Sequence, residues 1–270
     1  ELGKQVYYQP DATIIHYEGL SSGVVPNQGV KRGQLTNRQT FVARWHRTLE
    51  GHRPRDTNSE LEVDRGVRAR VLVVEATMIT PDQDSGSVRL QAMLELLVEL
   101  DCKVSFVADN LEHSQPYVHD LQQAGIEVWH APYIKSVANL IRKHGSQYDV
   151  IIFCRHYVCA PYLELARRWA PDARIVFDTI DLHYLREGRM AVLEASASLK
   201  RAAEKTKRRE LALVDSADTT LVVSPVEKEL LTSEVPGADI RIVSNIHEPH
   251  FEGLPFGDRR GVLFVGGFKH

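Results

Sequence analysis

The chain has 270 residues, of which 43% are hydrophobic and 26% charged, and its formal net charge is -3. This length allows one large or two small domains, and the composition is that of an ordinary soluble globular protein. Because 33 basic residues face 36 acidic ones, no global basic field indicates a nucleic-acid partner. No apolar run reaches the roughly 18 residues that a membrane span needs, and no leader peptide follows Glu1.

The three cysteines, Cys102, Cys154 and Cys159, form no CxxC pair, and each lies in or near an apolar run. Such cysteines are typical of buried free thiols rather than disulfides. We therefore expect a reducing, cytoplasmic environment.

The first 50 residues predict two short strands, at 6–8 and 13–17, a loop at 19–29 and then an amphipathic helix. The helix is indicated by a face whose positions recur at steps of three and four, namely Leu35, Arg38, Val42, Trp45 and Leu49, with Phe41 beside them. Two strands and a helix cannot form a core of their own, so this strand-strand-helix piece must pack on something else. The charged stretch 51–69 is interpreted as an interdomain linker.

From residue 70 onward, apolar strand patterns alternate strictly with helix patterns. Strands are predicted at 70–75, 103–108, 126–129, 149–154, 174–177, 219–223 and 240–243, and helices at 87–100, 116–124, 136–144, 160–169, 189–216 and 225–233. This alternation predicts an α/β fold with a mostly parallel, Rossmann-like sheet and helices on both faces, spanning 70–255. A Pro/Gly-rich connection then leads to residues 256–270, which are predicted to hold the first strand of a second, truncated lobe.

Ionisable residues cluster directly after the predicted strand at 174–177. Asp178, Asp181, His183, Arg186 and Glu187 follow one another within ten positions. Ligands of open α/β sheets bind beyond the carboxyl ends of the strands, so chemistry is expected here. The alternative is that Asp178 and Asp181 cap the next helix and His183 lies on the surface.

A second candidate segment, residues 80–89, links the first strand to the first helix. Gly86 would allow a ligand to approach the backbone, and Ser85 or Ser87 could cap the helix. The helix N-terminus could hold an anion, with Arg89 one turn further on. The segment is neither a dinucleotide fingerprint nor a P-loop, and the alternative is an ordinary capping loop.

Arg155 and His156 follow the predicted fourth strand, again at a carboxyl end. An arginine there could clamp a phosphate, and a histidine could titrate near neutral pH. The alternative is that both belong to a loop and satisfy local backbone groups.

The helix predicted at 189–216 carries a cluster of charges: Lys200, Arg201, Lys205, Lys207, Arg208 and Arg209, interspersed with Glu194, Glu204 and Glu210. Such a cluster could touch an anionic membrane surface, which would place the protein peripherally at the inner face of the membrane. The pattern favours the alternative, a solvated helix face with i,i+4 ion pairs.

Taken in chain order, five stretches resemble the amino-terminal lobe of a family 4 glycosyltransferase of the GT-B fold. They are the loop 82–89, the stretch 178–187, Val223-Ser-Pro-x-Glu227, Val243-Ser-Asn-Ile-His-Glu248 and Phe264-Val-Gly-Gly-Phe268. The resemblance implies that this lobe binds a glycan or lipid-linked acceptor, while the carboxyl lobe binds the nucleotide-sugar donor. It implies donor contacts at Gly266 and Gly267 and acceptor or phosphate contacts at Ser85, Gly86, Ser87, Arg89, Arg155, His156 and Asp178.

The same resemblance assigns Asp181 and His183 to acceptor contact first and to catalysis second. It implies no cofactor for the family 4 part. The family's Glu-x7-Glu motif does not occur in this sequence, so we expect this piece alone to be inactive without its flanking lobes.

Residues 7–45 resemble the carboxyl end of a family 2 glycosyltransferase of the GT-A fold, which would make 1–50 its tail. The resemblance rests on Tyr7-Tyr-Gln-Pro10, Ile15-His-Tyr-Glu-Gly-Leu-Ser21 and Arg44-Trp45. In that family, a histidine at the position of His16 helps to hold a divalent metal. Since the second metal motif would lie upstream, no metal site is expected in this chain, and a structural role for His16 is favoured over that of a remnant ligand.

The leading hypothesis is therefore part of a bifunctional glycosyltransferase that builds a surface polysaccharide. The alternative is a non-catalytic α/β module that binds sugar or nucleotide, or docks a catalytic unit. A Glu-x7-Glu motif and a full second lobe beyond residue 270 would favour the enzyme.

Overall fold

The computed structural model describes residues 13–15, 29–52, 62–247 and 253–262. The chain divides into two units, Glu1–Arg65 and Gly66–His270, which are described separately. No helix among the described residues is long and apolar enough to cross a membrane.

The described part of the first unit is mainly one helix, α1 (Gln34–Glu50), preceded by a 3-10 turn, η1 (Gly29–Gly33). The predicted helix is thus confirmed, although α1 has no buried side chain. Residues 13–15, predicted as part of a strand, have no regular secondary structure. The predicted strand at 6–8 and His16 lie outside the described residues.

The second unit is built on a seven-stranded sheet in which every strand pairs parallel to its neighbours. The strand order is β3-β2-β1-β4-β5-β6-β7, so the predicted Rossmann-like fold is confirmed. The strands are β1 (Ala69–Glu75), β2 (Cys102–Ala108), β3 (Glu127–Trp129), β4 (Val150–Cys154), β5 (Arg174–Asp178), β6 (Thr219–Val222) and β7 (Ile240–Ile242).

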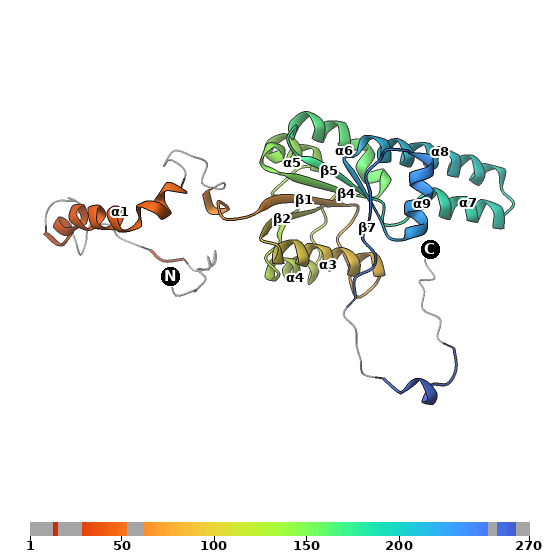
Figure 1. Ribbon diagram of the computed structural model, residues 1–270, viewed down its shortest axis with the longest axis horizontal. Helices are drawn as coiled ribbons and strands as arrows, with labels where there is room; N and C mark the ends of the chain where they lie inside the picture. Colours follow the sequence, from red (N-terminus) through yellow and green to blue (C-terminus); the bar gives the residue numbers. More distant parts are fainter. Residues whose placement is uncertain (1–12, 16–28, 53–61, 248–252, 263–270) are drawn as a thin grey trace. The chain divides into compact units, whose positions relative to one another are not determined.

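Helices cover both faces of this sheet (Figure 1). Alternate residues of β1 point to opposite faces: Val71 and Val73 join the cluster under one layer, and Leu72 and Val74 join the other. The first layer is α3 (Ser85–Glu99) and α4 (Tyr117–Gln123). The second layer holds α5 (Val137–His144), α6 (His156–Trp169), α7 (His183–Leu193), α8 (Ala197–Ser216) and α9 (Pro225–Glu234).

Two helix predictions need correction. The helix predicted at 189–216 is two helices, because Ala195 has φ 48° and interrupts the run, and Ser196 then caps α8 by accepting the Leu199 N–H. The helix predicted to begin at residue 160 begins at His156 and includes Pro161. An interior proline usually ends or kinks a helix, so the sequence pattern hides this earlier start.

The order of the strands defines where a ligand is expected. Going along the chain, the sheet first grows from β1 toward β3 and then continues from β4 on the other side of β1. The reversal falls between β1 and β4, and such a switch point leaves a crevice at the carboxyl ends of the two strands. Glu75 ends β1 and Arg155 follows β4, so both lie at this point.

Candidate active site at the carboxyl edge of the sheet

The sheet brings most of the predicted site residues to one edge. Strands β1, β4 and β5 are neighbours, so the segments after Glu75, Cys154 and Asp178 emerge side by side. Gly86 reaches the same edge: a Cβ at this position would lie 3.7 Å from a side-chain carbon of Ile180 and 3.9 Å from Nη2 of Arg155. The first turn of α3 therefore lies against the ends of β4 and β5.

The loop before α3 is held by Asp84, which is the N-cap of this helix. Its carboxylate accepts the backbone N–H of Ser87 at 2.8 Å and hydroxyls from Ser87 at 2.6 Å and Thr80 at 3.2 Å. Burial raises the pKa of Asp84, but these hydrogen bonds outweigh it and the net pKa is lowered. The cap was expected at Ser85 or Ser87 and is therefore corrected to Asp84; Ser85 is exposed in the first turn.

Arg89 and Asp178 form a buried ion pair behind this loop. The two guanidinium nitrogens donate to the two carboxylate oxygens at 2.7 and 3.1 Å, and Nε donates to the Val243 carbonyl at 2.9 Å. The two residues are 1% and 0% exposed. The Arg89 side chain thus ties α3 to the end of β5 and to the segment after β7, and its predicted contact with a phosphate stays a prediction.

Arg155 lies at the switch point in a strained conformation. Its φ is 69°, a region that residues with a side chain rarely adopt. Its Nε donates to Glu75 at 2.7 Å. Burial lowers the pKa of Arg155, but the charge and hydrogen bond of Glu75 raise it further, so the side chain stays cationic. Strain of this kind gathers at ligand-binding sites.

Asp181 follows a second strained residue, Ile180, whose φ of 63° is exceptional for a β-branched side chain. The Asp181 carboxylate accepts from Arg186 at 2.6 Å and lies 3.5 Å from Nδ1 of His183. Its side chain remains 35% exposed. Asp181 is therefore a carboxylate that a ligand can reach at the edge of the sheet.

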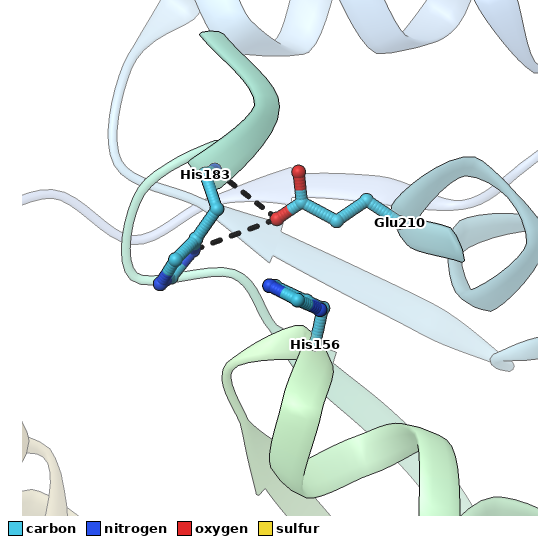
Figure 2. Close-up of side chains that lie close together, drawn as sticks. All are labelled: His156, His183 and Glu210. Carbon is cyan, nitrogen blue, oxygen red and sulfur yellow. Dashed lines mark hydrogen bonds and ion pairs between the residues drawn. The ribbon is translucent and has the colours of Figure 1, made fainter. Parts of the chain in front are cut away.

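A buried cluster of two histidines and one carboxylate lies beside Asp181 (Figure 2). His183 begins α7, His156 begins α6 and Glu210 comes from α8. Glu210 accepts the backbone N–H groups of His183 at 3.1 Å and Tyr184 at 2.9 Å, and its Oε1 lies 3.6 Å from Nδ1 of His183. The two imidazole rings meet edge to face, with centroids 4.9 Å apart.

Sequence reasoning missed two residues of this site. Glu210 was expected on a solvated helix face, but it is 0% exposed and holds the first turn of α7. Glu75 was read only as the end of a strand, although an acidic residue after a buried apolar run is a signal that could have identified it. His156 was expected in a loop and instead is the buried first residue of α6.

A cavity of about 370 Å³ lies on the α3–α4 side of the same loop. Asp82, one of its lining residues, accepts a hydrogen bond from the hydroxyl of Tyr117 at 2.8 Å. Small-molecule sites usually occupy a few hundred Å³. The cavity is lined by Ile79, Pro81, Asp82, Gln91, Pro116, Tyr117, Asp120 and Leu121.

The two ring nitrogens of His183 have different surroundings. Nδ1 faces three oxygens: the Asp181 carbonyl at 3.2 Å and carboxylates of Asp181 and Glu210. Figure 2 shows the far end of the ring pointing away from Glu210. Such an arrangement can fix the ring orientation and leave Nε2 for a hydroxyl group. The predicted donor contacts Gly266 and Gly267 lie outside the described residues.

Comparison with known proteins finds similar structures but no matching sequence family. No family model matches the chain, and no curated protein matches it at a significant level. Among solved structures, UGT2 of Phytolacca americana in complex with UDP-2fluoro-glucose and pterostilbene is 11% identical, with a TM-score of 0.46 over 67% of this chain. Sucrose-phosphate synthase of Thermosynechococcus elongatus is 15% identical, with a TM-score of 0.42 over 66% of this chain. The chain spans about half the length of these proteins, 53% and 48%.

Proposed function

We propose that this chain is the acceptor-binding lobe of a glycosyltransferase that moves a sugar from a nucleotide-sugar donor to a hydroxyl of a glycan or lipid-linked acceptor. The process it would serve is the synthesis of a surface polysaccharide.

The observation that carries the proposal is the convergence of strained and ionisable residues at the switch point of the sheet. Arg155 and Ile180, both at positive φ, lie next to Gly86. Asp181 follows Ile180, and its carboxylate is partly exposed. Two stretches of the sequence resemblance, 82–89 and 178–187, lie at this same edge, and the stretch 264–268 lies outside the described residues. The neighbouring cavity gives room for a group of the acceptor.

In the proposed reaction, the acceptor oxygen forms a bond to the anomeric carbon while the bond from that carbon to the nucleotide diphosphate breaks. Asp181 and Nε2 of His183 hold the acceptor hydroxyl in place, which lowers the barrier by orientation. The hydroxyl proton leaves either to His183 or to the departing diphosphate, depending on stereochemistry. The cationic side chain of Arg155 stabilises the negative charge that develops on the diphosphate.

Transfer by the full-length protein that contains this chain tests the proposal. The protein is incubated with a panel of radiolabelled nucleotide sugars and a membrane or glycan extract as acceptor source. Asp181→Asn and His183→Gln should each lower kcat/KM by a factor of roughly 10² to 10⁴, the range typical of groups that act on a reacting proton.

The matched controls are Asp172→Asn and His119→Gln, whose side chains are exposed. Asp172 precedes β5, at the opposite end of this strand from Asp181, and His119 lies on α4. Both should transfer sugar at the rate of the unmodified protein. If Asp181→Asn and His183→Gln also match the unmodified protein, the site assignment is wrong. If no nucleotide sugar is consumed but one binds, the chain belongs to a non-catalytic binding module.

A further inference from the structure

The cluster of His156, His183 and Glu210 has a feature that acceptor binding does not require. One ligand atom from each residue lies within 4.8 Å of the other two. All three residues are more than nine-tenths buried, at 6%, 5% and 0% exposure. We propose that these three side chains bind a divalent transition metal ion of the zinc type.

The first support is that His156 is buried without a hydrogen bond. Its Nδ1 has no partner among the described residues, although leaving a buried polar group unpaired is costly. Figure 2 shows the ring directed toward Glu210 and His183. A metal ion would give this side chain the partner that no described protein group supplies.

A second buried atom without a partner lies close by. Glu187 is four residues after His183 on α7, so the two side chains share one face of the helix. Its Oε2 is buried and has no hydrogen-bond partner among the described residues, and its charge acts on His156. A cation in the cluster would be attracted by Glu187 as well as by Glu210.

The chemistry of the three ligands fits the same ion. Two imidazoles and one carboxylate, with a position left open, form the set typical of catalytic zinc sites. Nδ1 of His183 and Oε1 of Glu210 are 3.6 Å apart, and tetrahedral zinc with bonds of about 2.1 Å needs ligand atoms about 3.4 Å apart. The metal would replace the proton on Nδ1 of His183, and Nε2 would keep its proton. With the ion bound, His183 could donate a hydrogen bond to the acceptor hydroxyl but could not take its proton, which would then leave with the diphosphate.

Glu210 would not lose its structural role on binding the ion. Its two oxygens accept the N–H groups of His183 and Tyr184, and each carboxylate oxygen has a second lone pair. These two hydrogen bonds hold the carboxylate in place, as groups behind a metal ligand commonly do. The expectation that the family 4 part needs no cofactor thus differs from this inference, which does not depend on glycosyl transfer.

The test is zinc binding by the whole chain, prepared without a histidine tag and stripped with a chelator. Zn²⁺ is titrated in competition with a chromophoric chelator, and Co²⁺ is added separately to record the visible absorption of a tetrahedral site. We expect one ion per chain and a rise in the thermal midpoint on adding Zn²⁺.

His156→Phe keeps an aromatic ring in the stack and removes both nitrogens. We expect its zinc affinity to fall at least about 100-fold, since even outer groups of metal sites change affinity by about 10- to 100-fold. Its thermal midpoint without metal should be close to that of the unmodified chain or higher. If this variant does not fold, His156→Asn takes its place with the same expected loss.

His144→Phe is the matched control, because His144 also stacks on an aromatic ring, that of Trp129, with centroids 5.5 Å apart. It should bind zinc as the unmodified chain does. The proposal is overturned if the unmodified chain takes up no zinc. It is equally overturned if His156→Phe binds as tightly as His144→Phe, because the zinc is then adventitious and held by other histidines.

Discussion

The second unit holds two buried groups of ionisable side chains, the pair Arg89–Asp178 and the cluster of His156, His183 and Glu210. Asp178 and His183 are five positions apart in the sequence, but the two groups differ in their hydrogen bonding. Arg89 and Asp178 pair through two hydrogen bonds, and the third guanidinium nitrogen, Nε, donates to the Val243 carbonyl. The cluster around His183 satisfies Glu210 but leaves an atom of His156 without a partner among the described residues. Burial is common to both groups, so burial does not identify function; the unpaired atom does. The hydrogen bonds of Arg89 and Asp178 account for their burial, whereas a buried polar atom without a partner requires a further explanation, such as a bound water or ion.

The largest effect expected from this difference is on Arg89. Replacing it with Ala leaves the Asp178 carboxylate charged and without a partner in the core, which should lower the free energy of unfolding by about 3–5 kcal/mol. Urea denaturation measures this loss. Arg241→Ala, which breaks an exposed pair with Asp239, should change the stability far less, because solvent screens this pair.

If Arg89→Ala were as stable as Arg241→Ala, Asp178 would have to escape to solvent or stay protonated, and the two groups would not differ as described. The double variant Arg89→Leu, Asp178→Leu tests whether the loss of stability comes from the unpaired charge. It should recover much of the lost stability, because a buried pair removed as a unit leaves no isolated charge.

The next effect concerns Glu210. Glu210→Ala leaves the buried N–H groups of His183 and Tyr184 without acceptors, and each unpaired donor costs about 1–3 kcal/mol. We therefore expect a loss of about 2–4 kcal/mol in urea denaturation. Glu204→Ala on the exposed side of the same helix should change stability by less than about 0.5 kcal/mol. Equal losses for the two variants would mean that Glu210 lies on a solvated face after all.

A smaller effect is expected at the cap of α3. Asp84→Ala removes the acceptor for the Ser87 N–H and should cost about 1 kcal/mol at neutral pH. Because the folded pKa of Asp84 is below its ordinary value, its contribution is full above about pH 4 and is lost as pH falls through the folded pKa. The difference between Asp84→Ala and the unmodified chain should therefore shrink as the pH falls below the ordinary pKa of an aspartate, and a difference independent of pH would exclude a charged cap.

The smallest effect is expected where the unpaired atom is removed. In the absence of metal, His156→Phe keeps the ring contacts and abolishes a buried polar atom without a partner. Its free energy of unfolding should stay within about 1 kcal/mol of the unmodified chain or rise. A loss of 3 kcal/mol or more would show that His156 makes an essential protein contact, and the contrast with Arg89 would disappear.

The fold was predictable from sequence because buried parallel strands leave continuous apolar runs. The runs at residues 70–75 and 149–154 match β1 and β4 to within one residue at each end. The break between α7 and α8 escaped prediction because neither glycine nor proline marks it. The only local signal is Ser196, whose hydroxyl caps α8.

The site was predictable in part, for a reason that follows from the sheet. Residues after parallel strands must emerge at one edge, so Arg155, Asp181 and His183 could be grouped before any coordinates. The side chains that pair with the residues at this edge could not be predicted in the same way. Asp178 was expected to face a ligand because the sequence does not reveal that Arg89, 89 positions earlier, reaches back to it. Glu210 could not be recognised because only the folding of α8 against α7 gives it a buried position.

The positive φ of Ala195 also determines how close His183 and Glu210 lie to each other. His183 and Glu210 are separated by 27 positions. In one unbroken helix they would lie about 40 Å apart, at 1.5 Å per residue. The chain reverses at Ala195, and the backbone nitrogen of His183 lies 3.1 Å from Oε1 of Glu210 instead. The lengths of α7 and α8 therefore determine whether Glu210 reaches His183. One residue inserted into α8 between Ser196 and Glu210 would turn that carboxylate by about 100° around the helix axis and out of reach of α7.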